Sequence, residues 1–127
     1  MCIDNDYTEY TAQLYERRGE GIKLERVDIK IDDWKPVANE CHGNVTEFCL
    51  RYDGFIPVRG WLYHDYFGER DYVLFIAHSA VESNGVLYDI TPSILPPIFP
   101  FITANESEEE YANMIQNNGI IQIRHQI

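Results

Sequence analysis

An apolar strand and the turn after it constrain the fold of this chain most strongly. Residues Tyr72 to Val81 are apolar on both faces of an extended chain, which is typical of a central strand. The turn Ser83-Asn84-Gly85 follows, and an Asn-Gly pair favours a two-residue hairpin loop of type I′. Val86 to Ile90 then returns antiparallel, with Ser83 paired to Val86. The sequence therefore predicts a β-hairpin at the centre of a sheet.

This hairpin register brings two ionisable residues together. With a two-residue loop, Ala80 lies opposite Asp89, and His78 projects from the same face as Ala80. His78 and Asp89 are then diagonal neighbours within side-chain reach. An aspartate placed there accepts a hydrogen bond from one imidazole nitrogen, fixes the tautomer and stabilises the imidazolium.

Residues 39–48 read NECHGNVTEF, and this segment places Cys41 at the start of an expected helix. The helix is expected over residues 41–51, with Val45 and Phe48 on its apolar face. A thiolate is favoured at a helix N-terminus and beside a histidine, so Cys41 is a candidate nucleophile. Its backbone N–H has no partner inside the helix and is a candidate oxyanion donor. Asn39 and Trp34, in the preceding loop, are the two candidates for a second donor.

The other segments predict a mixed fold. Helices are expected over residues 5–18, where Asp6 and Glu9 have capping-box spacing, and over residues 107–117, where Ser107 and Glu110 form a second capping box. Strands are expected within residues 22–31, within 55–66 with breaks near Pro57 and Gly60, and over 119–125. The proline-rich stretch 91–100 is expected to be irregular. The fold class is therefore α+β, with the cysteine-bearing helix packed on a small antiparallel sheet of four to six strands.

The chain order Cys41, His78, Asp89, and above all the segment from His78 through Asp89-Ile-Thr-Pro92, resembles the papain-like cysteine superfamily in its transglutaminase-like or NlpC/P60-like branch. The resemblance covers residues 34–92, and the whole chain is expected to form a single domain. Residues 1–33 are expected to form a helix and a strand before this core. Residues 93–127 are expected to form a proline-rich loop, a helix and a last strand after it. It implies a papain-like or transglutaminase-like core. Ser79, directly after the histidine, and His42, directly after the cysteine, depart from the family's usual pattern.

The resemblance also implies an activity. Cys41 is expected to be the nucleophile, His78 the general base and acid, and Asp89 the orienting residue, with Asn39 or Trp34 supporting the oxyanion. The expected reaction is hydrolysis or acyl transfer at an amide, peptide or isopeptide bond of a peptide or protein, through a thioester. No cofactor or metal is expected. Zinc is disfavoured because no pair among Cys41, His42, Cys49, His64 and His78 has a standard ligand spacing. His42 is interpreted as a solvent-facing helix residue.

Charge supplies an alternative function. The 127 residues carry 21 Asp and Glu against 10 Lys and Arg, a formal net charge of -11. Such a field disfavours direct binding to nucleic acid and to anionic membranes. It suits a non-catalytic acidic binding protein or inhibitor that engages a basic surface of a partner protein. Three cysteines without a C-x-x-C pair, no visible signal peptide and no long apolar run favour a cytoplasmic location.

Overall fold

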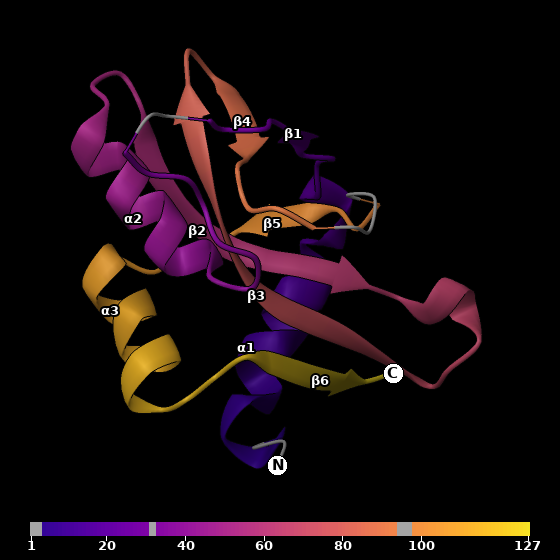
Figure 1. Ribbon diagram of the computed structural model, residues 1–127. Coiled ribbons are helices and arrows are strands. Elements are labelled where there is room, and N and C mark those ends of the chain that lie inside the picture. The colour runs from indigo at the N-terminus through magenta and orange to yellow at the C-terminus, as the bar shows by residue number, and fades with distance from the viewer. Residues whose placement is uncertain (1–3, 31–32, 94–97) are drawn as a thin grey trace.

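A computed structural model describes residues 4–30, 33–93 and 98–127. The α+β prediction is confirmed, because helices pack against one small mixed sheet (Figure 1). In chain order the elements are α1 (Asp4–Glu16), η1 (Arg18–Glu20), β1 (Glu25–Arg26), α2 (Cys41–Arg51), β2 (Ile56–His64), η2 (Tyr66–Gly68), β3 (Tyr72–Ser83), β4 (Val86–Asp89), β5 (Phe101–Thr103), α3 (Glu108–Ala112), the π-helical turn η3 (Asn113–Asn117) and β6 (Gln122–Gln126). The strand order is β1-β4-β3-β2-β5, and β6 pairs with β3. None of the helices described is long and apolar enough to cross a membrane.

The long strand β3 organises the sheet, as predicted. One of its edges pairs antiparallel with β2 along residues 74–82. Its other edge is shared, because β6 pairs with residues 72–76 and β4 with residues 81–83. Figure 1 shows these two strands at opposite ends of β3. Among the described residues, the stretch from His78 to Ala80 has no strand paired along this second edge, so the sheet is open there.

The hairpin register is confirmed. Ser83 pairs with Val86, and the loop residues Asn84 and Gly85 have φ angles of 54° and 82°. Positive φ at both loop positions is the signature of a type I′ turn, and it explains the Asn-Gly pair. The loop therefore has the two residues that the prediction requires, and His78 and Asp89 lie on the same face of the hairpin.

The cysteine helix also begins where the sequence predicts, because α2 starts at Cys41. It is anchored by Asn44, whose side chain is buried. The Asn44 amide accepts from the N–H of Val37 at 3.0 Å and donates to the carbonyl of Val37 at 2.8 Å. It also donates to Thr91 Oγ1 at 3.1 Å. Both the loop before the helix and the segment after β4 are thereby tied to the first turn of α2.

The predicted break in the strand over residues 55–66 is wrong, since β2 runs unbroken through Pro57 and Gly60. Pro57 is tolerated because β5 pairs only with residues 60–62, so β2 has an open edge where the proline lacks its N–H. Gly60 is required by close packing. A Cβ atom there would collide with the carbonyl oxygen of Ile102 and with the ring of Phe101.

Three further element boundaries differ from expectation. The strand expected within residues 22–31 is reduced to Glu25–Arg26, which pairs parallel to β4 instead of antiparallel; residues 31 and 32 lie outside the described residues. The first helix is already formed at Asp4, so Asp6 lies within it and is not its cap. The Ser107 capping box is confirmed, although the helix that follows changes to a π-helical turn after Ala112. Part of the irregular stretch 91–100, residues 94–97, also lies outside the described residues.

Two apolar clusters fix the helices on the sheet. The first gathers side chains of α1, α3 and the sheet around Trp61 and Phe75, both fully buried. The second joins α2 to β3 through Val45, Phe48 and Val81. Phe75 and Val81 lie on the same face of β3, because they are an even number of positions apart in an extended strand. The start of α2 is therefore held close to the open stretch of β3.

Candidate active site

The open stretch of the sheet borders a cavity of about 740 Å³. Cys41 enters it from the first turn of α2, His78 from β3 and Asp89 from the end of β4. The structure thus brings the three residues of the predicted site to one cavity. The remaining wall is mostly aliphatic and aromatic, formed by Leu24, Leu62, Ile76, Ala77, Ile98, Phe99, Ile115, Ile120 and Ile121.

His78 and Asp89 form a buried ion pair across the hairpin. His78 Nε2 lies 3.2 Å from Asp89 Oδ1, and their side chains are only 12% and 5% exposed. The two atoms are at ion-pair distance, but the N–H is not aligned as in a well-formed hydrogen bond, and Nε2 has no other partner among the described residues. The two side chains therefore form a buried ion pair when His78 is protonated.

Asp89 is held as a carboxylate by its neighbours. Burial acts to raise its pKa, but His78, the N–H of Thr91 and Arg26 outweigh burial and lower it. The Thr91 N–H donates to Oδ1 at 3.2 Å, and Arg26 NH2 lies 3.5 Å from Oδ2. A fixed negative charge therefore faces the imidazole of His78.

His78 is shifted toward its protonated form. Burial acts to lower its pKa, whereas hydrogen bonding and charge interactions with Asp89 and then Cys41 raise it to about 9. Because Nε2 faces Asp89, the other ring nitrogen, Nδ1, is the one left for the cysteine. His78 is thus placed between a carboxylate and a thiol, as an acid–base group requires.

The Cys41 thiol is shifted toward thiolate. Burial acts to raise its pKa, but interactions with His42 and then His78 outweigh burial and lower it to about 6. By contrast, burial raises the pKa of the Cys49 thiol, two turns further along the same helix. At neutral pH these two pKa shifts favour a Cys41 thiolate beside a His78 imidazolium.

The two candidates for the second oxyanion donor are separated by the structure. Asn39 lines the cavity with Cys41 and has a positive φ of 66°, in a turn just before the helix. Trp34 is not among the residues that line it. Its ring packs against Phe48, with centroids 6.5 Å apart, within the cluster beneath α2. Only Asn39 is brought to the cysteine.

The interpretation of His42 as a solvent-facing residue is wrong. Its ring is partly buried, with Nδ1 2.6 Å from the hydroxyl oxygen of Ser79, on β3 next to His78. It also contacts the edge of Tyr111 from α3, with ring centroids 5.8 Å apart. The first turn of α2 rests directly on β3, so the side chain after Cys41 points into the protein. A helical periodicity based on apolar residues alone does not detect this contact.

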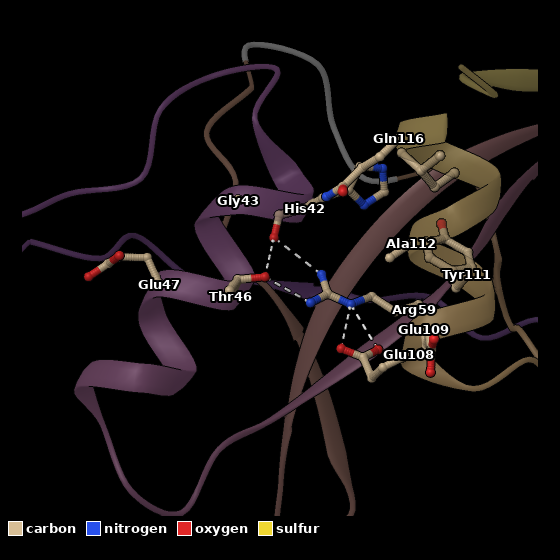
Figure 2. A pocket seen from close by; sticks show the side chains of 11 residues that line it. His42, Gly43, Thr46, Glu47, Arg59, Glu108, Glu109, Tyr111, Ala112 and Gln116 are labelled. Carbon is tan, nitrogen blue, oxygen red and sulfur yellow. Dashed lines mark hydrogen bonds and ion pairs between the residues drawn. The ribbon is translucent and has the colours of Figure 1, made fainter. Parts of the chain in front are cut away.

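A second cavity, of about 510 Å³, lies between α2 and α3 on the other side of His42 (Figure 2). Arg59 crosses it from β2. Its guanidinium donates to Glu108 at 3.0 Å, to Thr46 Oγ1 at 2.9 Å and to the carbonyl of His42 at 3.2 Å. It also donates to Ser79 Oγ at 2.9 Å. Sequence reasoning missed Arg59, since nothing local marks it and its partners come from three other elements.

In the described part of the chain, no group of three or more His, Cys, Asp or Glu side chains is arranged to hold a metal ion. Comparisons of this chain with protein-family models, with curated proteins and with solved structures found no match.

Proposed function

We propose that this protein is a cysteine enzyme that cleaves or transfers acyl groups at amide, peptide or isopeptide bonds through a thioester. One observation carries the proposal: Cys41, at the N-terminus of α2, shares a cavity with His78, whose far nitrogen lies 3.2 Å from the buried Asp89. A cysteine at a helix start can act as a nucleophile, a neighbouring imidazole can carry its proton, and a carboxylate behind the imidazole can orient the ring. A papain-like or transglutaminase-like core is part of this proposal.

The first half of the reaction forms the thioester. The Cys41 thiolate attacks the carbonyl carbon, and the carbonyl oxygen takes the negative charge. As the tetrahedral intermediate collapses, the C–N bond breaks and His78 Nδ1–H gives its proton to the leaving amine. Asp89 stabilises the imidazolium before the transfer and holds the ring in place after it.

The second half releases the acyl group. Neutral His78 takes a proton from water, or from an acceptor amine, as that nucleophile attacks the thioester carbon. The C–S bond then breaks and the Cys41 thiolate is restored, with His78 again protonated. Every step uses side chains that line the cavity.

The oxyanion is expected to be stabilised at the start of α2. Glu40, which precedes the helix, makes no side-chain capping bond, so the first N–H groups of α2 are not capped by that residue. The N–H of Cys41 is the first donor, and Asn39 supplies the second from the turn before the helix.

The cavity wall indicates what kind of acyl group fits. Its aliphatic and aromatic lining, from Leu24 to Ile121, is continuous with the thiol. Burial of apolar surface there contributes about 25 cal/mol per Å². We therefore propose an acyl side with an apolar side chain in preference to a charged one.

The test is the pH dependence of alkylation at each cysteine, read by mass spectrometry. In the wild-type protein, Cys41 is expected to react much faster than Cys49 near pH 6, and this advantage is expected to disappear in His78→Ala. His78→Gln, which keeps the side-chain size, guards against misfolding, and His64→Gln serves as the matched control. If Cys41 titrates like an ordinary thiol near pH 8.5, whether or not His78 is present, the proposal fails.

Substrate class is tested with acyl probes that carry a reactive carbonyl. Probes with leucine- or phenylalanine-like side chains are expected to label Cys41 faster than probes with aspartate- or lysine-like ones. Absence of any labelling, together with an ordinary thiol, would favour the alternative of an acidic protein that binds a basic partner.

A further inference from the structure

The thiol of Cys41 has two imidazole neighbours, and the reaction above uses only one of them. Cys41 and His42 line the same cavity. A hydrogen bond with His42 is the largest single interaction that lowers the pKa of the Cys41 thiol. His42 is held by contacts that have no part in the chemistry of His78 and Asp89. The hydrogen-bond chain behind His42 determines which of its nitrogens carries the proton.

The chain begins at Arg59, which can only donate. A guanidinium has five N–H groups and no acceptor, so in its 2.9 Å contact with Ser79 the hydroxyl oxygen must accept. The Arg59 side chain is 12% exposed and is fixed by four further hydrogen bonds, to Glu108, Thr46 and the His42 carbonyl. Arg59 is therefore the donor and Ser79 the acceptor in this hydrogen bond, whichever way the serine hydroxyl is rotated.

Ser79 passes this direction on to His42. The residue is fully buried, and its single O–H must find an acceptor to avoid the cost of an unmade hydrogen bond. Among the described residues, the His42 Nδ1 atom, 2.6 Å away, is the acceptor within reach. If Nδ1 carried the proton instead, the serine oxygen would accept twice and its own hydrogen would be left buried without a partner.

A neutral imidazole that accepts at Nδ1 carries its hydrogen at Nε2. We propose that His42 is a second catalytic donor, which directs Nε2–H at the Cys41 sulfur, with Ser79 and Arg59 as positioning residues that fix its tautomer. This assignment rests on the proposed function, because it describes how the same nucleophile is activated. The edge contact with Tyr111, whose hydroxyl donates to the carbonyl of Gly60 at 2.7 Å, holds the ring in this orientation.

The two histidines then divide the work. His78 faces Asp89 and exchanges protons with the leaving group and the attacking water. His42 faces Arg59 through Ser79, so its exchangeable hydrogen stays on Nε2 and stabilises the thiolate by donation alone. The charged and titratable groups around this assembly include His78 and Asp89 on the hairpin, Arg59 on β2, Glu47 on α2, and Glu108, Glu109 and Tyr111 on α3.

The tautomer is read directly by nitrogen NMR of the histidine rings at pH 8, with the His42 signals assigned by their loss in His42→Gln. The expected result is an unprotonated, acceptor-type Nδ1 and a protonated Nε2 in the wild-type protein. Ser79→Ala removes the hydroxyl and is expected to produce a mixture of the two tautomers. A protonated Nδ1 in the wild type overturns the proposal.

The donation to sulfur is read by titration of thiolate absorbance in the ultraviolet, with Cys49 replaced by Ser. His42→Phe keeps an aromatic ring but has no hydrogen-bond donor. It is expected to raise the pKa of the Cys41 thiol by about one unit or more, so that about tenfold less thiolate is present than in the wild type at low pH. His42→Gln, which retains a neutral N–H donor, is expected to restore most of that loss. His64→Phe is the control.

The outcomes separate the two proposals. Suppose that the thiol pKa changes in His42→Phe but not in His78→Gln, and that no acyl probe labels the protein. The donor assignment would then stand, and the proposed function would fail. A thiol pKa that is equal in wild type, His42→Phe and His42→Gln would defeat the donor assignment even if His78 proves essential.

Discussion

Asn44 donates a hydrogen bond of 3.1 Å to Thr91 Oγ1, and this contact links the cysteine helix to the segment that carries Asp89. Asn44 lies one turn after Cys41, and Thr91 lies two residues after Asp89. The same amide also makes two hydrogen bonds with the backbone of Val37. One buried side chain thus joins the two segments that carry Cys41 and Asp89.

Asn44→Ala is expected to lower the free energy of unfolding by about 1–3 kcal/mol, because the backbone of Val37 and the buried hydroxyl of Thr91 lose their hydrogen-bond partner. It is also expected to slow alkylation of Cys41, as the first turn of α2 is no longer fixed against β4. Chemical denaturation and the alkylation rate measure the two effects. Leu50→Ala, on the exposed face of the same helix, is the matched control. A change in Asn44→Ala no larger than in this control would contradict the anchoring role.

The rate of acylation is expected to be bell-shaped in pH. Cys41 has a pKa lowered to about 6, so the thiolate is lost as the pH falls below that value. His78 has a pKa raised to about 9, so the imidazolium that protonates the leaving amine is lost as the pH rises above it. At one pH unit outside either limit the rate is expected to fall about tenfold. Turnover of a chromogenic amide across pH 4–11 would test this, and a single ionisation near pH 8.5 would contradict it.

Asp89→Asn is expected to move chiefly the alkaline side of that profile. The carboxylate raises the pKa of His78, so an uncharged amide lets it fall, by about 1–3 units for a close opposite charge. The alkaline limit therefore moves to lower pH, and the rate near pH 8 drops. Asp53→Asn, an exposed residue after α2, is the control. If the two variants have the same profile, Asp89 does not act through His78.

Two glycines are expected to respond to alanine in opposite directions. Gly60→Ala places a methyl group against the Ile102 carbonyl and the Phe101 ring, and is expected to destabilise by about 1–3 kcal/mol. Gly43 lies inside α2, where an added methyl group would meet no neighbouring atom within 4 Å, so Gly43→Ala is expected to stabilise by about 0.5–1 kcal/mol. Thermal unfolding of both variants would measure this difference, and equal effects would refute the packing argument at Gly60.

Short-range signals were sufficient for the hairpin and for the start of the cysteine helix. The Asn84-Gly85 loop admits one register, and that register alone placed His78 beside Asp89. The start of α2 at Cys41 follows from the loop before it and the apolar spacing after it. Both features depend on residues that are close together in the sequence.

The errors share a physical origin in contacts between distant segments. Pro57 marks a break only if both edges of β2 are paired, and the partial coverage by β5 depends on a segment more than forty residues later. His42 is solvent-facing only if α2 stands away from β3, whereas Ser79 lies directly beneath it. Trp34 is near Cys41 in sequence, but the loop turns its ring toward Phe48.

The division of one edge of β3 between β4 and β6 determines when the cavity can form during folding. Its walls include Leu24, from near the beginning of the chain, and Ile120 and Ile121, from just before the last strand. Closing these walls therefore requires the most distant segments to meet, which is the slowest kind of contact to make. A chain still being synthesised therefore holds Cys41 without the complete cavity wall until Ile120, Ile121 and β6 have docked.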